Sequence, residues 1–148
     1  YSSQFEVVST YVGWAIPGVL FKAISWSLGF ILLAKGEGKL FLITELISDI
    51  TTLVISILLY LVLGIEGLGI AYTINFAIYT TYMWIICKKR YCFVPEKTFY
   101  TVSLVAFVLV YTQALVVNFE ISNYVIPSIL SVIAILFSYI VLSKRLKV

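Results

Sequence analysis

Three ionisable side chains lie inside long apolar runs of the sequence: Lys22, Glu45 and Asp49. An ionisable group near the centre of a lipid bilayer costs about 2.5–3.5 kcal/mol on insertion scales, so its presence indicates a charged partner, a water-filled cavity or a role in transport. The ammonium of Lys22 can hold an anionic group, and a carboxylate can pair with that ammonium or carry a proton. These three residues are therefore the first candidates for chemistry.

The spacing along the chain places Lys22 and Asp49 at similar depths. Lys22 lies 13 residues before Lys35, and Asp49 lies 10 residues after Lys39. At 1.5 Å per residue, these separations are about 20 and about 15 Å from the same end of two helices that a short turn joins. We therefore expect the two side chains to approach each other. They would form either a buried ion pair that sets helix register or part of a hydrated cavity between the first three helices.

Polar and small residues extend these positions into stripes at helical spacing. The stripes are Gly18, Lys22, Ser25 and Gly29; Glu45, Ser48, Asp49, Thr52 and Ser56; and Tyr72, Asn75, Tyr79 and Tyr82. Small and hydroxyl residues are also typical of helix-packing surfaces in membranes, so the stripes fit tight packing as well as a cavity. Ser25 and Trp26 complete the candidate site beside Lys22. For Trp26, the pattern favours core packing over stacking on a sugar or a lipid.

The elements that position these residues are membrane-spanning helices. Apolar residues make up 62% of the 148 positions and charged residues only 11%, whereas about 25% of residues are charged in soluble domains. Apolar runs predict five spans, at about 11–34, 40–63, 67–87, 101–118 and 125–143, each long enough to cross about 30 Å of hydrocarbon. Lipid offers no partner to backbone polar groups, so all five should be α-helices. We predict an all-α transmembrane bundle that forms one domain over residues 1–148.

Loop charges predict how the bundle is oriented, because cytoplasmic loops collect Lys and Arg. With five spans, no Lys or Arg lies on one side, and the other receives Lys35, Lys39, Lys88, Lys89, Arg90, Lys97, Lys144, Arg145 and Lys147. This predicts an outside N-terminus and a cytoplasmic C-terminus. Residues 1–10 then form an outer loop after a preceding helix, so we expect the chain to be the C-terminal part of a longer protein.

The sequence offers little for catalysis or metal binding. Histidine, the usual general base and the commonest metal ligand, is absent. Cys87 and Cys92 flank a basic stretch on the predicted cytoplasmic side, where thiols stay reduced, and their spacing lacks the partners of a zinc site. We therefore expect no enzyme activity, no metal and no cofactor. Since the basic residues follow membrane topology, nucleic acid is not an expected partner.

Two segments resemble a known family. Residues 18–36, GVLFKAISWSLGFILLAKG, and residues 64–72, GIEGLGIAY, are similar to the polysaccharide flippases that move lipid-linked O-antigen units. These flippases belong to the superfamily that also contains multidrug exporters of the toxic-compound extrusion type. In such proteins a helix ends in an Ala-Lys-Gly-like cytoplasmic turn, and a Gly-x-x-Gly-x-Gly turn starts the second helix after it. The resemblance covers residues 1–87, and the last two helices only by position and hydropathy.

The resemblance implies a bacterial inner-membrane transporter and a role for the charged residues. The chain would form much of the C-terminal lobe of a two-lobed transporter, next to the missing N-terminal part of the same protein and to membrane lipids. The substrate would be an undecaprenyl-pyrophosphate-linked oligosaccharide, moved by alternating access. Lys22 matches a basic position of the family and would attract the pyrophosphate or an acidic sugar. Relatives often carry an acid where Val19 stands, which leaves Asp49, with Glu45, as the candidate to pair with Lys22 or carry a coupling proton.

Three other functions fit parts of the pattern. A multidrug or cation exporter of the same superfamily would place acids and aromatic rings in its cavity. A membrane enzyme of polysaccharide assembly would need an outer loop rich in Arg, His or acids, but the predicted outer loops are short and contain no base. A purely structural membrane subunit would tolerate neutral replacement of all three intramembrane charges.

Overall fold

The computed structural model describes residues 3–118 and 125–146. In these residues the chain forms five α-helices: α1 Ser3–Ala34, α2 Gly38–Leu63, α3 Ile65–Tyr91, α4 Lys97–Asn118 and α5 Val125–Leu146. Neither described range contains a strand. The predicted all-α helical bundle is therefore confirmed, and each of the five predicted spans lies on a separate helix.

Four of the helices have the length and apolar composition of membrane spans. These are Val8–Ala34, Gly38–Leu63, Ile65–Tyr91 and Lys97–Leu115. Large apolar side chains on α2 are widely exposed, with Leu61 at 75% and Val62 at 78%. Such a surface suits lipid and not water, so the protein has the character of an integral membrane protein. That α5 also crosses the membrane stays a prediction.

The connections between helices are shorter than predicted. The expected loop at residues 1–10 is wrong over residues 3–10, because α1 already begins at Ser3 and no Gly or Pro precedes Gly13 to break it. The turn between α2 and α3 is reduced to Gly64, whose φ of 65° lies in the left-handed region that glycine tolerates. Helix α3 continues through its basic last turn, where cations stabilise the helix dipole. The segment at 119–124, between the last two predicted spans, lies outside the described residues.

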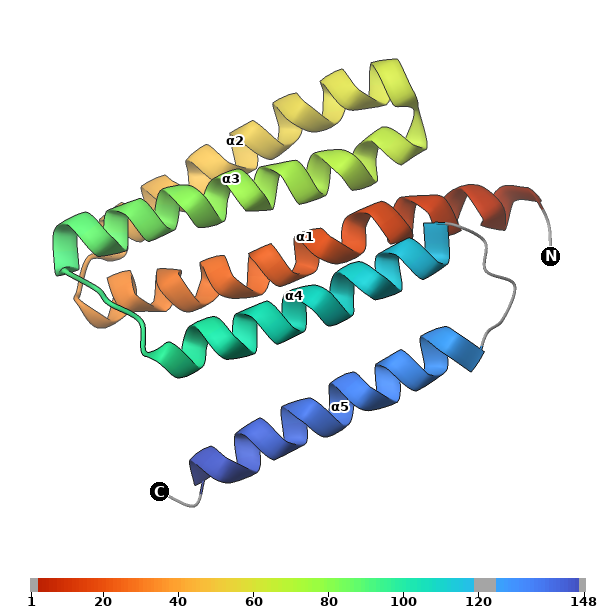
Figure 1. The fold of residues 1–148 in the computed structure, drawn as a ribbon. Coiled ribbons are helices and arrows are strands. Elements are labelled where there is room, and N and C mark those ends of the chain that lie inside the picture. Colours follow the sequence, from red (N-terminus) through yellow and green to blue (C-terminus); the bar gives the residue numbers. More distant parts are fainter. Residues whose placement is uncertain (1–2, 119–124, 147–148) are drawn as a thin grey trace.

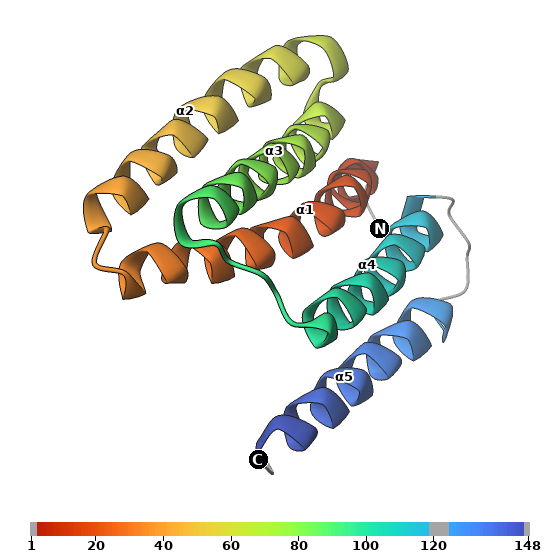
Figure 2. The same ribbon diagram turned by 60° about the vertical axis from the view of Figure 1, so that its left-hand side comes forward.

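The helices are not arranged in chain order. Both views show the sequence α2, α3, α1, α4, α5 across the bundle, with α3 between α1 and α2 (Figure 1 and Figure 2). We predicted that α1 and α2, joined by a short turn, lie side by side. Instead they separate from their common end at residues 35–37, and α3 occupies the space between them (Figure 2). Helices α4 and α5 lie on the far side of α1 (Figure 1), and among the described residues α5 contacts only α4.

Small residues explain why α3 packs so closely against α1. Gly67, Gly69 and Ala71 are buried on α3, Gly67 against the α2 backbone at Leu59 and Gly69 against α1. A Cβ atom on Gly69 would lie 2.5 Å from the carbonyl oxygen of Tyr11, so only glycine allows this approach of the two backbones. Close approach also lets α3 hydroxyls reach α1 carbonyls: Thr73 donates to Trp14 at 2.6 Å and Thr80 donates to Phe21 at 2.8 Å.

The core lies between α1 and α3, towards the end where α1 turns into α2. Its buried side chains are Leu28, Leu32, Tyr79, Met83 and Cys87. Beyond the core, the Arg90 guanidinium pairs with the Glu37 carboxylate at 3.0 Å and ties α3 to the turn before α2. Helix α4 is attached to the same end by aromatic contacts of Trp84 with Phe93, Phe99 and Tyr100, at ring distances of 6.1–6.4 Å.

Candidate functional site

The ammonium of Lys22 lies among three aromatic rings. Its Nζ is 5.2 Å from the ring centroid of Trp26, 5.7 Å from that of Tyr72 and 5.0 Å from that of Phe76. We call these four residues the Lys22 site. Each ring face attracts a cation, with a worth of about 0.5–1 kcal/mol at exposed positions and about 2 kcal/mol or more where water is excluded. The rings therefore stabilise a charged lysine at membrane depth without neutralising its charge.

Helical spacing on α1 and α3 builds the Lys22 site. Lys22 and Trp26 are four residues apart on α1, and Tyr72 and Phe76 are four apart on α3, so each pair shares one face. The Tyr72 and Phe76 rings touch, with centroids 4.7 Å apart. Gly18, one turn before Lys22, leaves the room that the Tyr72 ring needs, because a Cβ there would lie 2.5 Å from Tyr72. Glycine at position 18 thus permits the contact between Tyr72 and the α1 backbone.

Ser25 and Trp26, the other two candidates on α1, differ in burial. Ser25 is fully buried, and its hydroxyl donates to the Lys22 carbonyl of its own helix at 2.8 Å, so it is a packing residue next to the site. Trp26 is 53% exposed. The favoured interpretation of Trp26 as a core residue is therefore wrong for this chain. The α1–α3 core passes through Leu28 and Leu32 instead, and one part of the Trp26 ring faces Lys22 while the rest is open.

The expected pairing of Lys22 with Asp49 is absent. Within the described residues, no ion pair or hydrogen bond joins Asp49 to Lys22, and the Asp49 side chain is exposed. The physical reason is the position of α3, which separates α1 from α2 and presents its own rings to Lys22. Even at equal depth, two side chains do not meet across a third helix.

Glu45 forms a second polar cluster between α2 and α3. The Tyr79 hydroxyl donates a hydrogen bond to Oε1 of Glu45. One turn along, the Asn75 amide donates to the Ser48 hydroxyl at 3.5 Å, and both of these side chains are buried. We call Glu45, Ser48, Asn75 and Tyr79 the Glu45 site. A pocket of about 260 Å³ adjoins it, lined by Ile47, Ser48, Thr51, Asn75, Ile78, Tyr79 and Tyr82.

The two sites meet on one face of α3. Phe76 contacts Lys22 from the α1 side, and Tyr79 contacts Glu45 from the α2 side. Residues three apart on a helix are neighbours, with about 5–6 Å between their Cβ atoms. Lys22 and Glu45 therefore contact neighbouring positions on one face of α3, although they are not paired. The expected cavity walled by all three helices is not what the pocket shows, since its lining comes from α2 and α3 alone.

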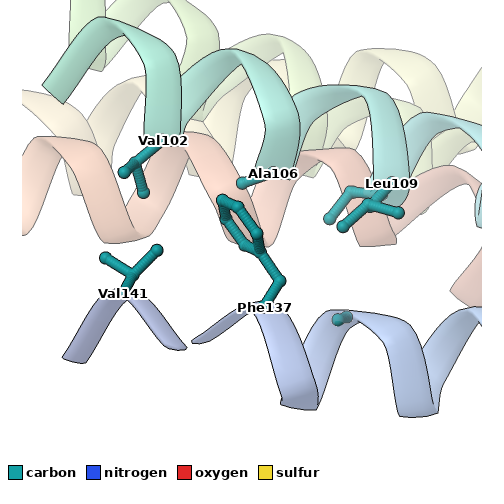
Figure 3. Close-up of a pocket in the computed structure, with 7 residues that line it drawn as sticks. Val102, Ala106, Leu109, Phe137 and Val141 are labelled. Carbon is teal, nitrogen blue, oxygen red and sulfur yellow. The ribbon is translucent and has the colours of Figure 1, made fainter. Parts of the chain in front are cut away.

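A pocket of about 300 Å³ lies between α4 and α5 (Figure 3). Its lining is wholly apolar and comprises Val102, Ala106, Leu109, Val110, Ala134, Phe137 and Val141. The Phe137 ring points from α5 towards Ala106, where the small side chain leaves space (Figure 3). No side chain that lines this pocket can donate a proton or bind a charge, so the pocket is not a candidate site for polar chemistry.

Metal chemistry finds no support in the described part of the chain. No group of three or more His, Cys, Asp or Glu side chains gathers there. Cys87 is buried against the α1 backbone, with its sulfur 3.7 Å from the Leu28 carbonyl, and Cys92 is exposed beyond the end of α3. Cys87 is therefore a packing residue, and the Cys92 thiol lies at the surface.

Phe76 was not among the residues predicted for the site, and Tyr79 was placed only in a polar stripe that fits packing as well as a cavity. The sequence pattern that could have identified both residues is the spacing of Tyr72, Phe76 and Tyr79, which places three rings on one face of a helix that begins with small residues.

Comparison with protein-family models, with curated proteins and with solved structures gives no match.

Proposed function

We propose that this protein moves a lipid-linked oligosaccharide across a bacterial inner membrane by alternating access, and that the Lys22 site holds the anionic head group. The observation that carries the proposal is a lysine ammonium at membrane depth that is surrounded by rings and has no carboxylate partner in the described residues. An ammonium without a counter-ion favours an anion such as a pyrophosphate.

Trp26 can contact the sugar part of the proposed ligand. Its ring is 53% exposed beside the ammonium, so it offers an apolar face next to a positive charge. Sugars carry apolar faces that stack on aromatic rings, and phosphates carry the charge that an ammonium binds. A phosphorylated saccharide presents both features side by side. The residues that resemble polysaccharide flippases include Lys22 and Trp26, which supports the same substrate class.

The deciding experiment compares lysine variants of the full-length protein. Lys22→Ala should reach the membrane at the normal level and fail to restore surface polysaccharide in a strain that lacks its flippase. Lys39→Ala is the matched control, since it removes an exposed lysine from the first turn of α2 and should restore polysaccharide fully. Full restoration by Lys22→Ala would remove Lys22 from the mechanism. Failure of both variants would indicate a general dependence on positive charge.

Export of organic cations is the second candidate function. One observation favours it: Asp49 is an exposed carboxylate at membrane depth with no ion pair in the described residues. A cation exporter would depend on Asp49 and Glu45 and would work without Lys22. Drug resistance measured beside polysaccharide display separates the two functions, because Lys22→Ala and Asp49→Asn then fail in opposite assays.

A further inference from the structure

The pocket between α4 and α5 has the lining of a site for a hydrocarbon chain. All of its described lining residues are apolar, and the pocket is open to its surroundings rather than enclosed. Protein interiors contain few voids larger than a water molecule, so a space of about 300 Å³ is not an ordinary packing gap. Apolar cavities do not hold ordered water. Within a membrane, the medium available to fill this pocket is therefore a lipid chain.

The pocket extends through one half of the predicted membrane thickness. Its lining runs from Val102 to Val110 on α4 and from Ala134 to Val141 on α5. At 1.5 Å per residue these stretches are about 12 and about 10 Å long, against about 15 Å of hydrocarbon in one leaflet. Val102 and Val141 lie just inside the ends of the predicted spans at residues 101 and 143. The pocket thus runs inwards from the membrane surface to a depth that one acyl chain reaches.

A polar contact closes the deep end of the pocket. The Gln113 amide donates a hydrogen bond to the Ser131 hydroxyl at 3.2 Å and so joins α4 to α5. Gln113 lies three residues beyond Val110, and Ser131 lies three residues before Ala134, so this bond follows directly after the apolar lining. A chain that enters the pocket would therefore enter from its other end.

That other end is positively charged. Lys97 begins α4, and Lys144 and Arg145 lie in the last turn of α5. Figure 1 and Figure 2 both place the start of α4 and the end of α5 at the same end of the bundle. The sequence next to these helix ends carries one acid, Glu96, so the net charge there is positive. Basic residues beside a membrane span attract anionic lipid head groups.

We infer that the pocket between α4 and α5 binds an anionic phospholipid, with one acyl chain along the apolar lining and the phosphate at the ends of the two helices. Among the described residues α5 contacts only α4, so the bound chain supplies packing that α5 otherwise lacks. The polyprenyl chain of the proposed substrate is a weaker match, because the Lys22 site lies on α1 and α3, away from α5. The inference does not depend on the proposed function.

The head-group part is tested by native mass spectrometry of the full-length protein. The probes are phosphatidylglycerol, which is anionic, and phosphatidylethanolamine, which is zwitterionic, with identical chains. Phosphatidylglycerol should bind about tenfold more tightly, and Lys97→Gln should lower this ratio about fivefold, the contribution of one basic residue near an anionic surface. Lys39→Gln is the matched control, since it removes an exposed lysine at the same end of the bundle, on α2, and should leave the ratio unchanged.

The chain part is tested by filling the pocket. The Phe137 ring points towards the small side chain of Ala106 (Figure 3), so Ala106→Leu takes up space that the chain would occupy. It should weaken the binding of phosphatidylglycerol about threefold, because dispersion contacts between the chain and the pocket wall are lost. Ala23→Leu makes the same change at an exposed position of α1 and should leave binding unchanged.

Three results would overturn the inference. Equal affinities for the two lipids, or the same ratio in Lys97→Gln and the wild type, would mean that the basic helix ends do not select the head group. Unchanged binding in Ala106→Leu would mean that the chain lies elsewhere. Displacement of bound phosphatidylglycerol by an equal concentration of a polyprenyl phosphate would mean that the pocket takes an isoprenoid chain instead.

A measurement on the unmodified protein keeps the inference testable if Ala106→Leu does not fold. Phosphatidylglycerol that carries a diazirine in its acyl chain is added to the full-length protein in nanodiscs and activated by light. Cross-links should concentrate in residues 102–110 and 134–141, which line the pocket. Cross-links spread equally over the exposed apolar surface of α2, where Leu61 and Val62 lie, would indicate contact with bulk lipid and overturn the inference.

Discussion

At the scale of single residues, aromatic rings stabilise the Lys22 ammonium by a different means from an ion pair. A carboxylate beside Lys22 would neutralise it and compete with an anionic ligand. Rings stabilise the same ammonium through their quadrupoles and leave its charge available. Depth and spacing along the sequence identified Lys22, but they could not distinguish these two environments, because the partner depends on which helix lies beside it.

Trp26 can be tested separately from Lys22. Trp26→Ala removes one ring from the Lys22 site and should weaken binding of a polyprenyl pyrophosphate about two- to fivefold, the equivalent of about 0.5–1 kcal/mol for an exposed cation–π contact. Trp26→Phe should lose less. Phe30→Ala is the control, because Phe30 is 65% exposed one turn further along α1 and is outside the Lys22 site. Equal losses for Trp26→Ala and Phe30→Ala would mean that exposed aromatic area, and not the lysine contact, matters.

At the scale of helices, the hydropathy pattern predicted the membrane spans but did not indicate which helices pack against each other. Lipid is as apolar as leucine, so burial against another helix leaves no hydropathy signal. The signal was in the small residues instead. At the start of α3, Gly69 allows the backbone approach to α1 at Tyr11, and Gly67 allows the approach to α2 at Leu59, so that α3 lies between its neighbours. This displacement brought Phe76 to Lys22 and Tyr79 to Glu45, and kept Asp49 away.

The contact between α1 and α3 therefore has a sharp test in glycine variants. Gly69→Ala places a methyl group 2.5 Å from the Tyr11 carbonyl oxygen, which belongs to backbone and cannot turn aside. We expect a loss of about 1–3 kcal/mol in the free energy of unfolding, measured by SDS titration of the purified protein. Gly38→Ala is the control, since nothing lies within 4 Å of a Cβ there, and it should be neutral or slightly stabilising. A neutral Gly69→Ala would contradict the close approach.

At the scale of the whole molecule, three positions lie at the same end of the bundle. The turn at residues 35–37, the end of α3 and the segment at 92–96 are joined there by the Arg90–Glu37 pair and by the ring contacts of Trp84 (Figure 1). Five of the Lys and Arg residues assigned to the cytoplasm by loop charge are Lys35, Lys39, Lys88, Lys89 and Arg90, and all lie at this end. The Gly64 turn lies at the opposite end and carries only Glu66.

The positive-inside rule then predicts the orientation of this bundle in the membrane. Cys92 is exposed at the basic end, whereas Cys87 is buried, so a membrane-impermeant maleimide should label Cys92 only after the cells are permeabilised. In a Cys92→Ser background, Glu66→Cys should label in intact cells, because the Gly64 turn would face outwards. The remaining Cys87 controls for reaction at a buried thiol and should stay unlabelled in both conditions. Labelling of Cys92 in intact cells would invert the topology and place the Glu37–Arg90 pair on the outer surface.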